Sequence, residues 1–297
     1  MKLDISTSLN LIFDGTFKTS VKDEMAHLAK CGFTCFDFNF NDMCSTLASP
    51  FVGKDWQAYL LDIKDFAGKN GIRFGQAHSP IIECPTYEGC GEDGFRELQY
   101  RTIEGCALMD IPWLVFHPIE KPGTEKECLD YNYEYYAPFV EACKKHGVGL
   151  ALENTCPAYI RSEMSKTETL IALADRFHDD IVGICWDTGH GNVHGGQKPL
   201  MASTDQYKNI TSIGKRLKVL HVSDNTGFHD DHVAPFEGNI KWQEVMRALS
   251  EIGYEGTFNY EAHFAVRRIP TCAPELLENK LCYLYKVGKV ICEQLGF

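Results

Sequence analysis

Residues 181–189 read IVGICWDTG, a short apolar run that ends in an acidic residue and a glycine turn. Runs of the same kind, rich in β-branched and aromatic residues, recur along the chain: KLDISTSL (2–9), FTCFDFNF (33–40), IRFGQAHS (72–79), PWLVFHP (112–118), VGLALEN (148–154), LKVLHVSD (217–224) and GTFNYEAH (256–263). Segments with helical periodicity separate them, at 21–31, 56–70, 96–109, 133–146, 167–177 and 242–251, and a further one at 274–295 closes the chain. This alternation predicts a parallel sheet whose strands are connected by helices.

Eight strand–helix units in 297 residues match the size of a (β/α)8 TIM barrel. The competing α/β fold, a doubly wound open sheet, usually has a glycine-rich phosphate-binding turn after its first strand. The corresponding segment here, STSLNLIFDGTF, contains neither GxGxxG nor a P-loop. No linker, low-complexity tract or change of composition divides the chain, so we expect one barrel domain over residues 1–297.

Composition and charge narrow the classes of partner. The formal net charge is −12, and no cluster of lysine and arginine is visible, so a nucleic-acid partner is not expected. Apolar runs are too short to span a bilayer, which predicts no membrane association. The first residues lack the apolar core of a signal peptide, which predicts a cytoplasmic protein.

The chain contains 13 cysteines, an odd number with irregular spacing and no CxxC pair. Several of them lie in apolar contexts: Cys31, Cys106, Cys143, Cys185 and Cys282. We therefore expect reduced thiols that pack as small hydrophobic side chains.

Six successive strand candidates end in a side chain that can bind metal: His78, His117, Glu153, Asp187, His221 and Glu261. Their spacing runs from 34 (187 − 153) to 40 (261 − 221) residues, about one strand–helix unit. The carboxyl ends of barrel strands meet at one mouth, where barrel active sites lie. We therefore expect these six side chains to converge on one pocket.

A lone histidine or glutamate at a strand end is more often a satisfied polar residue than a ligand. Three carboxylates and three imidazoles buried together would nevertheless be costly without a cation, so the pattern predicts a divalent metal. His190, three residues after Asp187, is a further ligand or a donor to substrate. In HDDHVAPFEG, Asp230 and His232 form a D-x-H pair that is either a solvated turn or a pair of additional ligands.

These residues lie in motifs that resemble the xylose isomerase-like TIM barrels. The motifs are AHSP, HP, ALENT, DTGH, LHVSDN, DDHVAPFEGNIKW and YEAH, and the resemblance covers essentially the whole chain. The group includes sugar and sugar-phosphate isomerases and epimerases, ketose 3-epimerases, inosose dehydratases and endonuclease IV-type AP endonucleases. Resemblance to ketose 3-epimerases implies a primary metal site at Glu153, Asp187, His221 and Glu261, with Glu153 and Glu261 also acting as acid and base. An arginine typical of those enzymes is absent, because Gly227 stands near its place.

The endonuclease pattern, three zinc ions held by nine residues, also has counterparts throughout. It adds His78, His117, His190, Asp230 and His232 as possible ligands. The net charge and the acidic segment after His78, SPIIECPTYEGCGED, argue against a surface for DNA. We therefore predict a metal-dependent sugar or sugar-phosphate isomerase or epimerase that transfers a proton next to a carbonyl through a metal-stabilised enediolate. The alternatives are a zinc-dependent AP endonuclease and an inosose dehydratase-like lyase.

The predicted cofactor is Zn²⁺ or Mn²⁺, with Mg²⁺ disfavoured by the additional histidines. The predicted partner is a carbohydrate, and the barrel could form a homo-oligomer. Substrate contacts are expected from a set of residues near the strand ends: His78, His117, His190, Trp113, Trp186, Arg267 and Arg268. The tryptophans could instead be core residues, and the arginines, placed where barrels often bind phosphate, could be a surface pair.

Overall fold

Eight parallel strands form the centre of the computed structural model, which describes residues 3–12, 20–81, 85–120, 123–156, 163–194, 204–267, 269 and 274–295. The strands are β1 (Ile5–Ser8), β2 (Cys35–Asn39), β3 (Arg73–His78), β4 (Trp113–Phe116), β5 (Gly149–Glu153), β6 (Val182–Asp187), β7 (Leu217–His221) and β8 (Phe258–Tyr260). Neighbouring strands pair in the order β7-β6-β5-β4-β3-β2-β1-β8. The predicted (β/α)8 TIM barrel is confirmed.

The barrel closes just beyond the ends of β7 and β8. Val222 forms a parallel bridge with Tyr260. The Val222 amide donates to the carbonyl of Asn259 at 2.8 Å, and the Glu261 amide donates to the carbonyl of Val222 at 3.0 Å. These bonds hold Glu261 beside the end of β7, next to His221.

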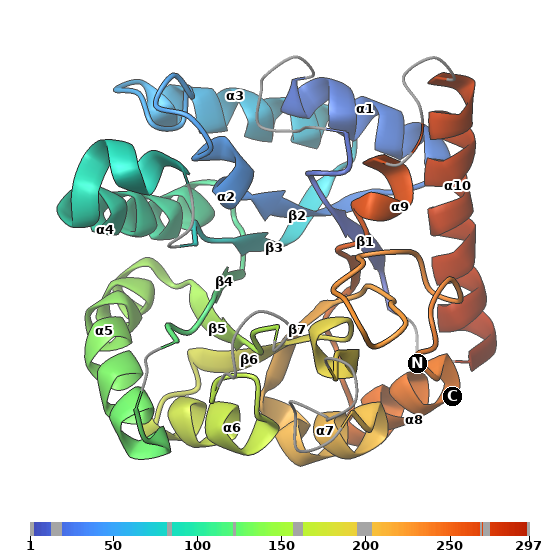
Figure 1. Cartoon of the computed structure of the whole chain (residues 1–297). Coiled ribbons are helices and arrows are strands. Elements are labelled where there is room, and N and C mark those ends of the chain that lie inside the picture. The colour runs from blue at the N-terminus through green and yellow to red at the C-terminus, as the bar shows by residue number, and fades with distance from the viewer. Residues whose placement is uncertain are drawn as a thin grey trace.

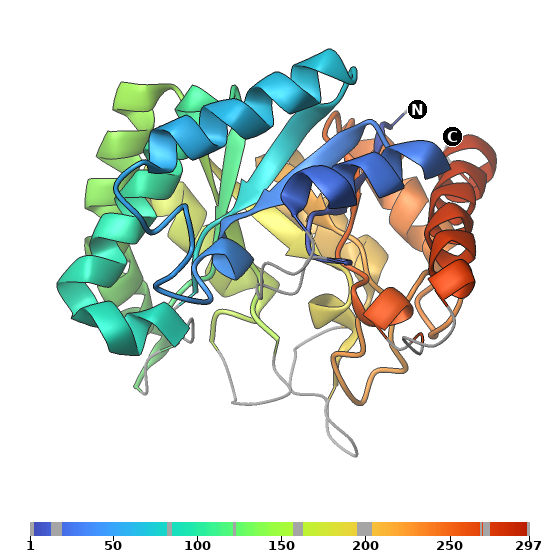
Figure 2. The same cartoon turned by 90° about the horizontal axis from the view of Figure 1, so that it is seen from above.

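Helices form the outer layer around the strands (Figure 1). They are α1 (Val21–Cys31), α2 (Phe40–Met43), α3 (Trp56–Lys69), α4 (Pro85–Leu108), α5 (Glu125–His146), α6 (Thr167–Arg176), α7 (Gln206–Ile213), α8 (Trp242–Ile252), α9 (Phe264–Arg267) and α10 (Pro274–Val290), with short turns η1 (His190–Asn192) and η2 (Gly214–Arg216) and a π-helical end η3 (Ile291–Leu295). The loop after β7, drawn in orange, lies with α2 and α9 at one end of the barrel, to which the carboxyl ends of the strands point (Figure 2).

Several helix boundaries differ from the prediction. α5 begins eight residues before the expected start at residue 133 (133 − 125), because Thr124 forms a capping box with Glu127 that satisfies the first backbone N–H groups. α4 also begins earlier and contains a break at Gly91, whose φ of 69° is not helical. α7 was not expected, and its N-terminus is capped by Asp205, whose side chain accepts from the Lys208 amide.

Alternation along the strands separates an apolar layer from a polar one inside the barrel. Val115, Ala151, Cys185 and Val219 form a buried cluster, with Trp113 packed against it. The residue two positions further along each of these strands faces the same way. Those residues are His117, Glu153, Asp187 and His221, so the ionisable side chains lie next to this buried apolar cluster.

No helix among the described residues is both long enough and apolar enough to cross a membrane.

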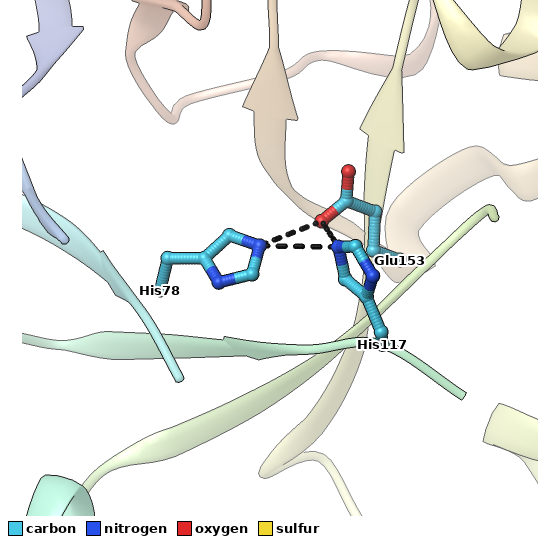
Figure 3. A group of neighbouring side chains, drawn as sticks. All are labelled: His78, His117 and Glu153. Carbon is cyan, nitrogen blue, oxygen red and sulfur yellow. Dashed lines mark hydrogen bonds and ion pairs between the residues drawn. The ribbon is translucent and has the colours of Figure 1, made fainter. Parts of the chain in front are cut away.

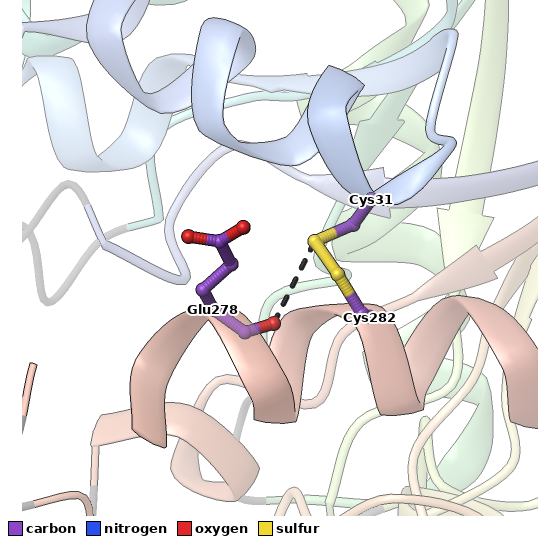
Figure 4. Close-up of a disulfide and its surroundings, with 3 residues drawn as sticks. All are labelled: Cys31, Glu278 and Cys282. Carbon is purple, nitrogen blue, oxygen red and sulfur yellow. Dashed lines mark hydrogen bonds between the residues drawn. A yellow bond between two sulfur atoms is a disulfide. The ribbon is translucent and has the colours of Figure 1, made fainter. Parts of the chain in front are cut away.

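A disulfide bond joins α1 to α10, between Cys31 and Cys282 (Figure 4). The expectation that these two cysteines are reduced core thiols was wrong. The first and the last long helices pack side by side and bring the two Cα atoms to 4.6 Å, although 251 residues separate them. Five of the other described cysteines are free thiols, as predicted for three of them (Cys106, Cys143 and Cys185), and the remaining two are Cys35 and Cys292.

Replacing both partners by serine in Cys31→Ser/Cys282→Ser is expected to lower the free energy of unfolding by about 2–5 kcal/mol, because the crosslink restricts the unfolded chain. Urea denaturation without reductant measures the difference. Cys106→Ser, which changes a free buried thiol, is the control for packing loss. Equal midpoints for the double variant and the oxidised wild type would contradict the stabilising role.

Candidate metal centre

The structure brings together all six side chains that were predicted at the strand ends. Glu153, Asp187 and His221 are the last residues of β5, β6 and β7, and His78 is the last residue of β3. The other two, His117 and Glu261, follow directly after β4 and β8. Because each strand ends at the same rim of the barrel, their side chains meet at its mouth.

Glu153 lies at the centre of this site and is fully buried. Its Oε1 lies 3.1 Å from His221 Nδ1 and 3.4 Å from His190 Nδ1. Its Oε2 lies 3.1 Å from His117 Nε2 and 3.4 Å from His78 Nε2. Figure 3 shows His78 and His117 pointing toward this carboxylate from the ends of β3 and β4. Their Nε2 atoms lie 3.1 Å apart.

The nine predicted ligands gather into three groups whose ligand atoms lie within 4.8 Å of one another. The β3–β4 group is His78, His117 and Glu153; the four-ligand group is Glu153, Asp187, His221 and Glu261; the loop group is His190, Asp230 and His232. Glu153 belongs to the first two groups. The loop group joins them through His190, which lies 3.4 Å from Glu153 and 3.3 Å from Asp230.

The donor atoms of these groups fit a divalent cation. Two buried carboxylate oxygens, Asp187 Oδ2 and Asp230 Oδ1, accept no hydrogen bond within the described part of the chain. Burying such an oxygen without a donor costs free energy, and a cation would remove that cost. Carboxylate oxygens combined with imidazole nitrogens are ligands of both Zn²⁺ and Mn²⁺.

The loop that carries Asp230 and His232 is held by Asp224, a residue that was not predicted to matter. The Asp224 carboxylate accepts from the backbone amides of Phe236 (3.0 Å) and Ile240 (3.2 Å) and from the Trp242 indole (3.0 Å). Its backbone pairs with Val233 as an isolated bridge. This clamp explains the spacing of LHVSDN and EGNIKW, since both ends of the loop attach to one carboxylate.

His232 adopts a left-handed backbone conformation with φ of 42°, which is unusual for a residue with a side chain. Its ring is fixed at both nitrogens: Nδ1 lies 2.7 Å from the Glu261 carbonyl oxygen and Nε2 lies 2.9 Å from Asp230 Oδ2. Strained backbone of this kind is typical of functional sites. The D-x-H loop is therefore not a solvated turn.

The model of the family described as "Xylose isomerase-like TIM barrel" matches residues 25–275. The chain belongs to this family. A curated relative, an uncharacterized protein of Methanocaldococcus jannaschii, is 31% identical over 164 residues, which cover 54% of this chain and 53% of that protein. Fructoselysine 3-epimerase of Escherichia coli O157:H7 is 36% identical over 59 residues, 20% of this chain and 19% of that enzyme. The chain thus spans about half the length, or less, of the curated relatives it matches.

Solved structures of xylose isomerase-like barrels share the whole fold. D-psicose 3-epimerase in the presence of D-fructose superposes with a TM-score of 0.71 at 14% identity, over 98% of this chain and 99% of that one. The IOLI protein with a binding zinc atom superposes with a TM-score of 0.73 at 17% identity, over 100% and 99%. At these identities the likeness establishes the fold alone.

A cavity of about 700 Å³ opens over the candidate metal centre. Metal-centre residues form one wall: His117, His190, Asp230, His232 and Glu261. Apolar and aromatic side chains form much of the rest, including Ile81, Phe95, Pro118, Tyr135 and Tyr136. Of the predicted substrate contacts, His117 and His190 line this cavity, and His78 is not among its lining residues.

Both tryptophans predicted to wall the pocket lie elsewhere. Trp186 is fully buried in the main hydrophobic core, and its indole donates to Gln206 Oε1 at 2.8 Å. It precedes Asp187 on β6, so strand alternation turns it away from the barrel interior. Trp113 is the first residue of β4 and lines a separate cavity with Asp4 and Pro112, at the end of the barrel where strands begin.

The predicted phosphate site at Arg267 and Arg268 is not seen among the described residues. Arg267 is occupied by structural contacts, since its guanidinium donates to the carbonyl of Asn10 at 2.6 Å and lies 3.6 Å from Asp42. Arg268 lies outside the described residues.

His263 extends the site and was not predicted as a ligand. It can share a metal with His232 and Glu261, and its ring centre lies 4.4 Å from that of His232. Burial lowers the pKa of His263 to about 3, and positive charge on His232 acts in the same direction. Its position two residues after a strand-end glutamate, in YEAH, was the available signal in the sequence.

Buried charges shift the pKa values across the centre. Burial alone would raise the pKa of Glu153, but positive charge on His221 and His117 holds it well below its usual range. Burial raises the pKa of Asp187 to about 6 despite the nearby imidazole of His190. Burial acts against the charged form of His78, His190 and His221, but the carboxylates around them raise the pKa of all three.

In the three-cation arrangement of the endonuclease alternative, a cation bound by the loop group would displace protons. Burial disfavours the charged form of His232, but Asp230 beside it raises its pKa to about 9. A metal ligand must be deprotonated, so the affinity for Zn²⁺ should fall about tenfold per unit of pH below about pH 9 for each proton displaced. Titration calorimetry in buffers of different ionisation enthalpy measures this release. A pH-independent affinity, or the same proton release in His232→Asn, would contradict the assignment.

Proposed function

We propose that the protein is a divalent-metal-dependent isomerase or epimerase of a sugar, which moves a proton at a carbon next to a carbonyl. The observation that supports this most directly is that the 700 Å³ cavity reaches the four-ligand group at Glu261, which belongs to that group and lines the cavity. Two of its carboxylates, Glu153 and Glu261, come from β5 and from the end of β8. Solved relatives of the same fold include several sugar 3-epimerases.

The four-ligand group would hold the catalytic cation, which as a Lewis acid lowers the cost of negative charge on the substrate carbonyl oxygen. The chain itself supplies the proton transfers. Glu261 lines the cavity and its carboxylate is the group that removes the carbon-bound proton. Glu153 belongs to the same four-ligand group without lining the cavity, and we assign it the second proton transfer. His190, also in the cavity wall, donates to a substrate hydroxyl.

The charges around the cavity favour an unphosphorylated sugar over a sugar phosphate. Among the described residues that line it, none is lysine or arginine, and three are carboxylic acids: Glu120, Asp230 and Glu261. Arg267, the described member of the arginine pair, is held by Asn10 and Asp42. A phosphate group would face these carboxylates, and no lysine or arginine among the described lining residues would neutralise it.

A dehydratase-like lyase would begin with the same removal of a carbon-bound proton. The roles assigned to Glu261, Glu153 and His190 would therefore be the same for that reaction.

A second candidate is a zinc-dependent endonuclease that cuts DNA at abasic sites. One observation favours it: nine side chains form three adjoining groups suited to three cations. The net charge of −12 opposes the approach of a phosphodiester backbone. We therefore rank it below the sugar enzyme.

Glu261→Gln is expected to reduce exchange of carbon-bound substrate hydrogen with solvent deuterium by about 10²–10⁴-fold, because the amide cannot accept the proton. Exchange into D-fructose, D-psicose and D-tagatose is followed by NMR, with the metal content of each sample measured. Glu153→Gln should lose hydrogen exchange to a similar extent, since Glu153 is assigned the other proton transfer. Asp187→Asn is the matched control, since it removes a ligand carboxylate with no proposed proton transfer, and its exchange should fall only in proportion to lost metal. Full exchange in Glu261→Gln would exclude its role as base.

Elemental analysis separates the two candidates. One ion per chain is expected for the sugar enzyme and three for the endonuclease. Protein loaded with Zn²⁺ should leave a DNA duplex with a single abasic site uncut. Cleavage at that site, lost in His232→Asn, would instead support the endonuclease.

A further inference from the structure

A chain of buried polar side chains crosses the barrel interior and ends at the metal centre. Thr257 donates to Gln76 Oε1 at 3.2 Å, and Gln76 Nε2 donates to Asp37 Oδ2 at 2.8 Å. Asn259 Nδ2 donates to the same oxygen at 3.2 Å. His221 Nε2 lies 3.3 Å from it. The Asp37 carboxylate, on β2, thus faces donors from β3, β8 and β7.

The two ring nitrogens of His221 face different surroundings. Nδ1 faces the four-ligand group, 3.1 Å from Glu153 Oε1 and 2.8 Å from Glu261 Oε2. Nε2 faces away from that group, toward Asp37. Both His221 and Asp37 are 1% exposed, so water does not compete for either group. Carboxylates face both nitrogens and only accept hydrogen bonds, so a neutral imidazole whose Nδ1 binds a cation carries its proton on Nε2, toward Asp37.

We propose that Asp37 is a positioning residue that holds the proton of His221 on Nε2 and so keeps the Nδ1 lone pair directed at the cation. Carboxylates that orient ligand histidines in this way also raise their basicity. The inference deepens the proposed function, since it rests on a metal bound by the four-ligand group. It adds to that function a residue from β2, a strand that carries none of the predicted ligands.

Burying the charged carboxylate of Asp37 costs free energy unless a positive or polar group nearby compensates it. Its Oδ1 accepts no hydrogen bond within the described chain, and its Oδ2 contacts two neutral amides and His221. Among those contacts, only His221 can offset the negative charge. The thiol of Cys185 also lies near His221. A thiol is a weak acceptor, so it orients an imidazole less well than a carboxylate does.

Asp37→Asn tests the proposal, because it keeps the size of the side chain and removes its charge. The affinity for Zn²⁺, measured by competition with a chromophoric chelator, should fall about 10–100-fold. Gln76→Met is the matched control: it breaks another contact of the same carboxylate but leaves the His221 contact. Its stability should fall, whereas its Zn²⁺ affinity should stay within about twofold of wild type. Cys185→Ala should also keep the wild-type affinity.

A measurement on the wild type does not depend on how the variants fold. With ¹¹³Cd bound and histidines labelled with ¹⁵N, cadmium should couple to Nδ1 of His221, and Nε2 should carry a slowly exchanging proton. Coupling to Nε2, or unchanged affinity in Asp37→Asn, would overturn the inference while leaving the metal-dependent function standing. Equal loss of metal in Gln76→Met would overturn it as well. A wild-type protein that binds neither Zn²⁺ nor Cd²⁺ would remove the proposed function and this inference together.

Discussion

Glu153 is buried between four imidazoles, and the arrangement of the barrel mouth depends on that contact. A carboxylate at this depth is tolerated only where positive charge surrounds it. The surrounding histidines come from different strands and from one turn, so each strand must end at the right height for the charges to meet. The raised pKa values of His78, His190 and His221 favour their protonated forms in the free protein, and a bound divalent cation would take the place of those protons. Folding and metal binding therefore use the same set of electrostatic contacts.

Much of this arrangement could be predicted because strands of a parallel barrel obey simple rules. Each strand contributes its last inward residue to one mouth, so ionisable residues at strand ends identify the centre without knowledge of the packing. The same alternation rule explains the error at Trp186, which precedes Asp187 and must therefore face outward. Trp113 was misplaced because it begins its strand, at the opposite end of the barrel. In both cases the residue type suggested a pocket and the position within the strand excluded it.

Other features depend on contacts that strand order does not describe. The role of Asp224 follows from four donors that a folded loop brings to one carboxylate, and only the loop itself shows that they converge. Asp37 sits in the middle of an apolar run, where pattern alone suggests a core position. The Cys31–Cys282 bond depends on the packing of the first long helix against the last. Sequence spacing carries no record of such a contact.

That bond also changes the topology of the molecule. A TIM barrel is circular in space but linear as a chain, so its first and last units normally meet only through noncovalent contacts. Here the crosslink encloses nearly the whole chain in a covalent ring, with all but the first strand inside it. A single cut in any loop within the ring would leave the two pieces attached. The seam between the first and last units is consequently the one junction between neighbouring units that does not rely on the peptide backbone for its covalent link.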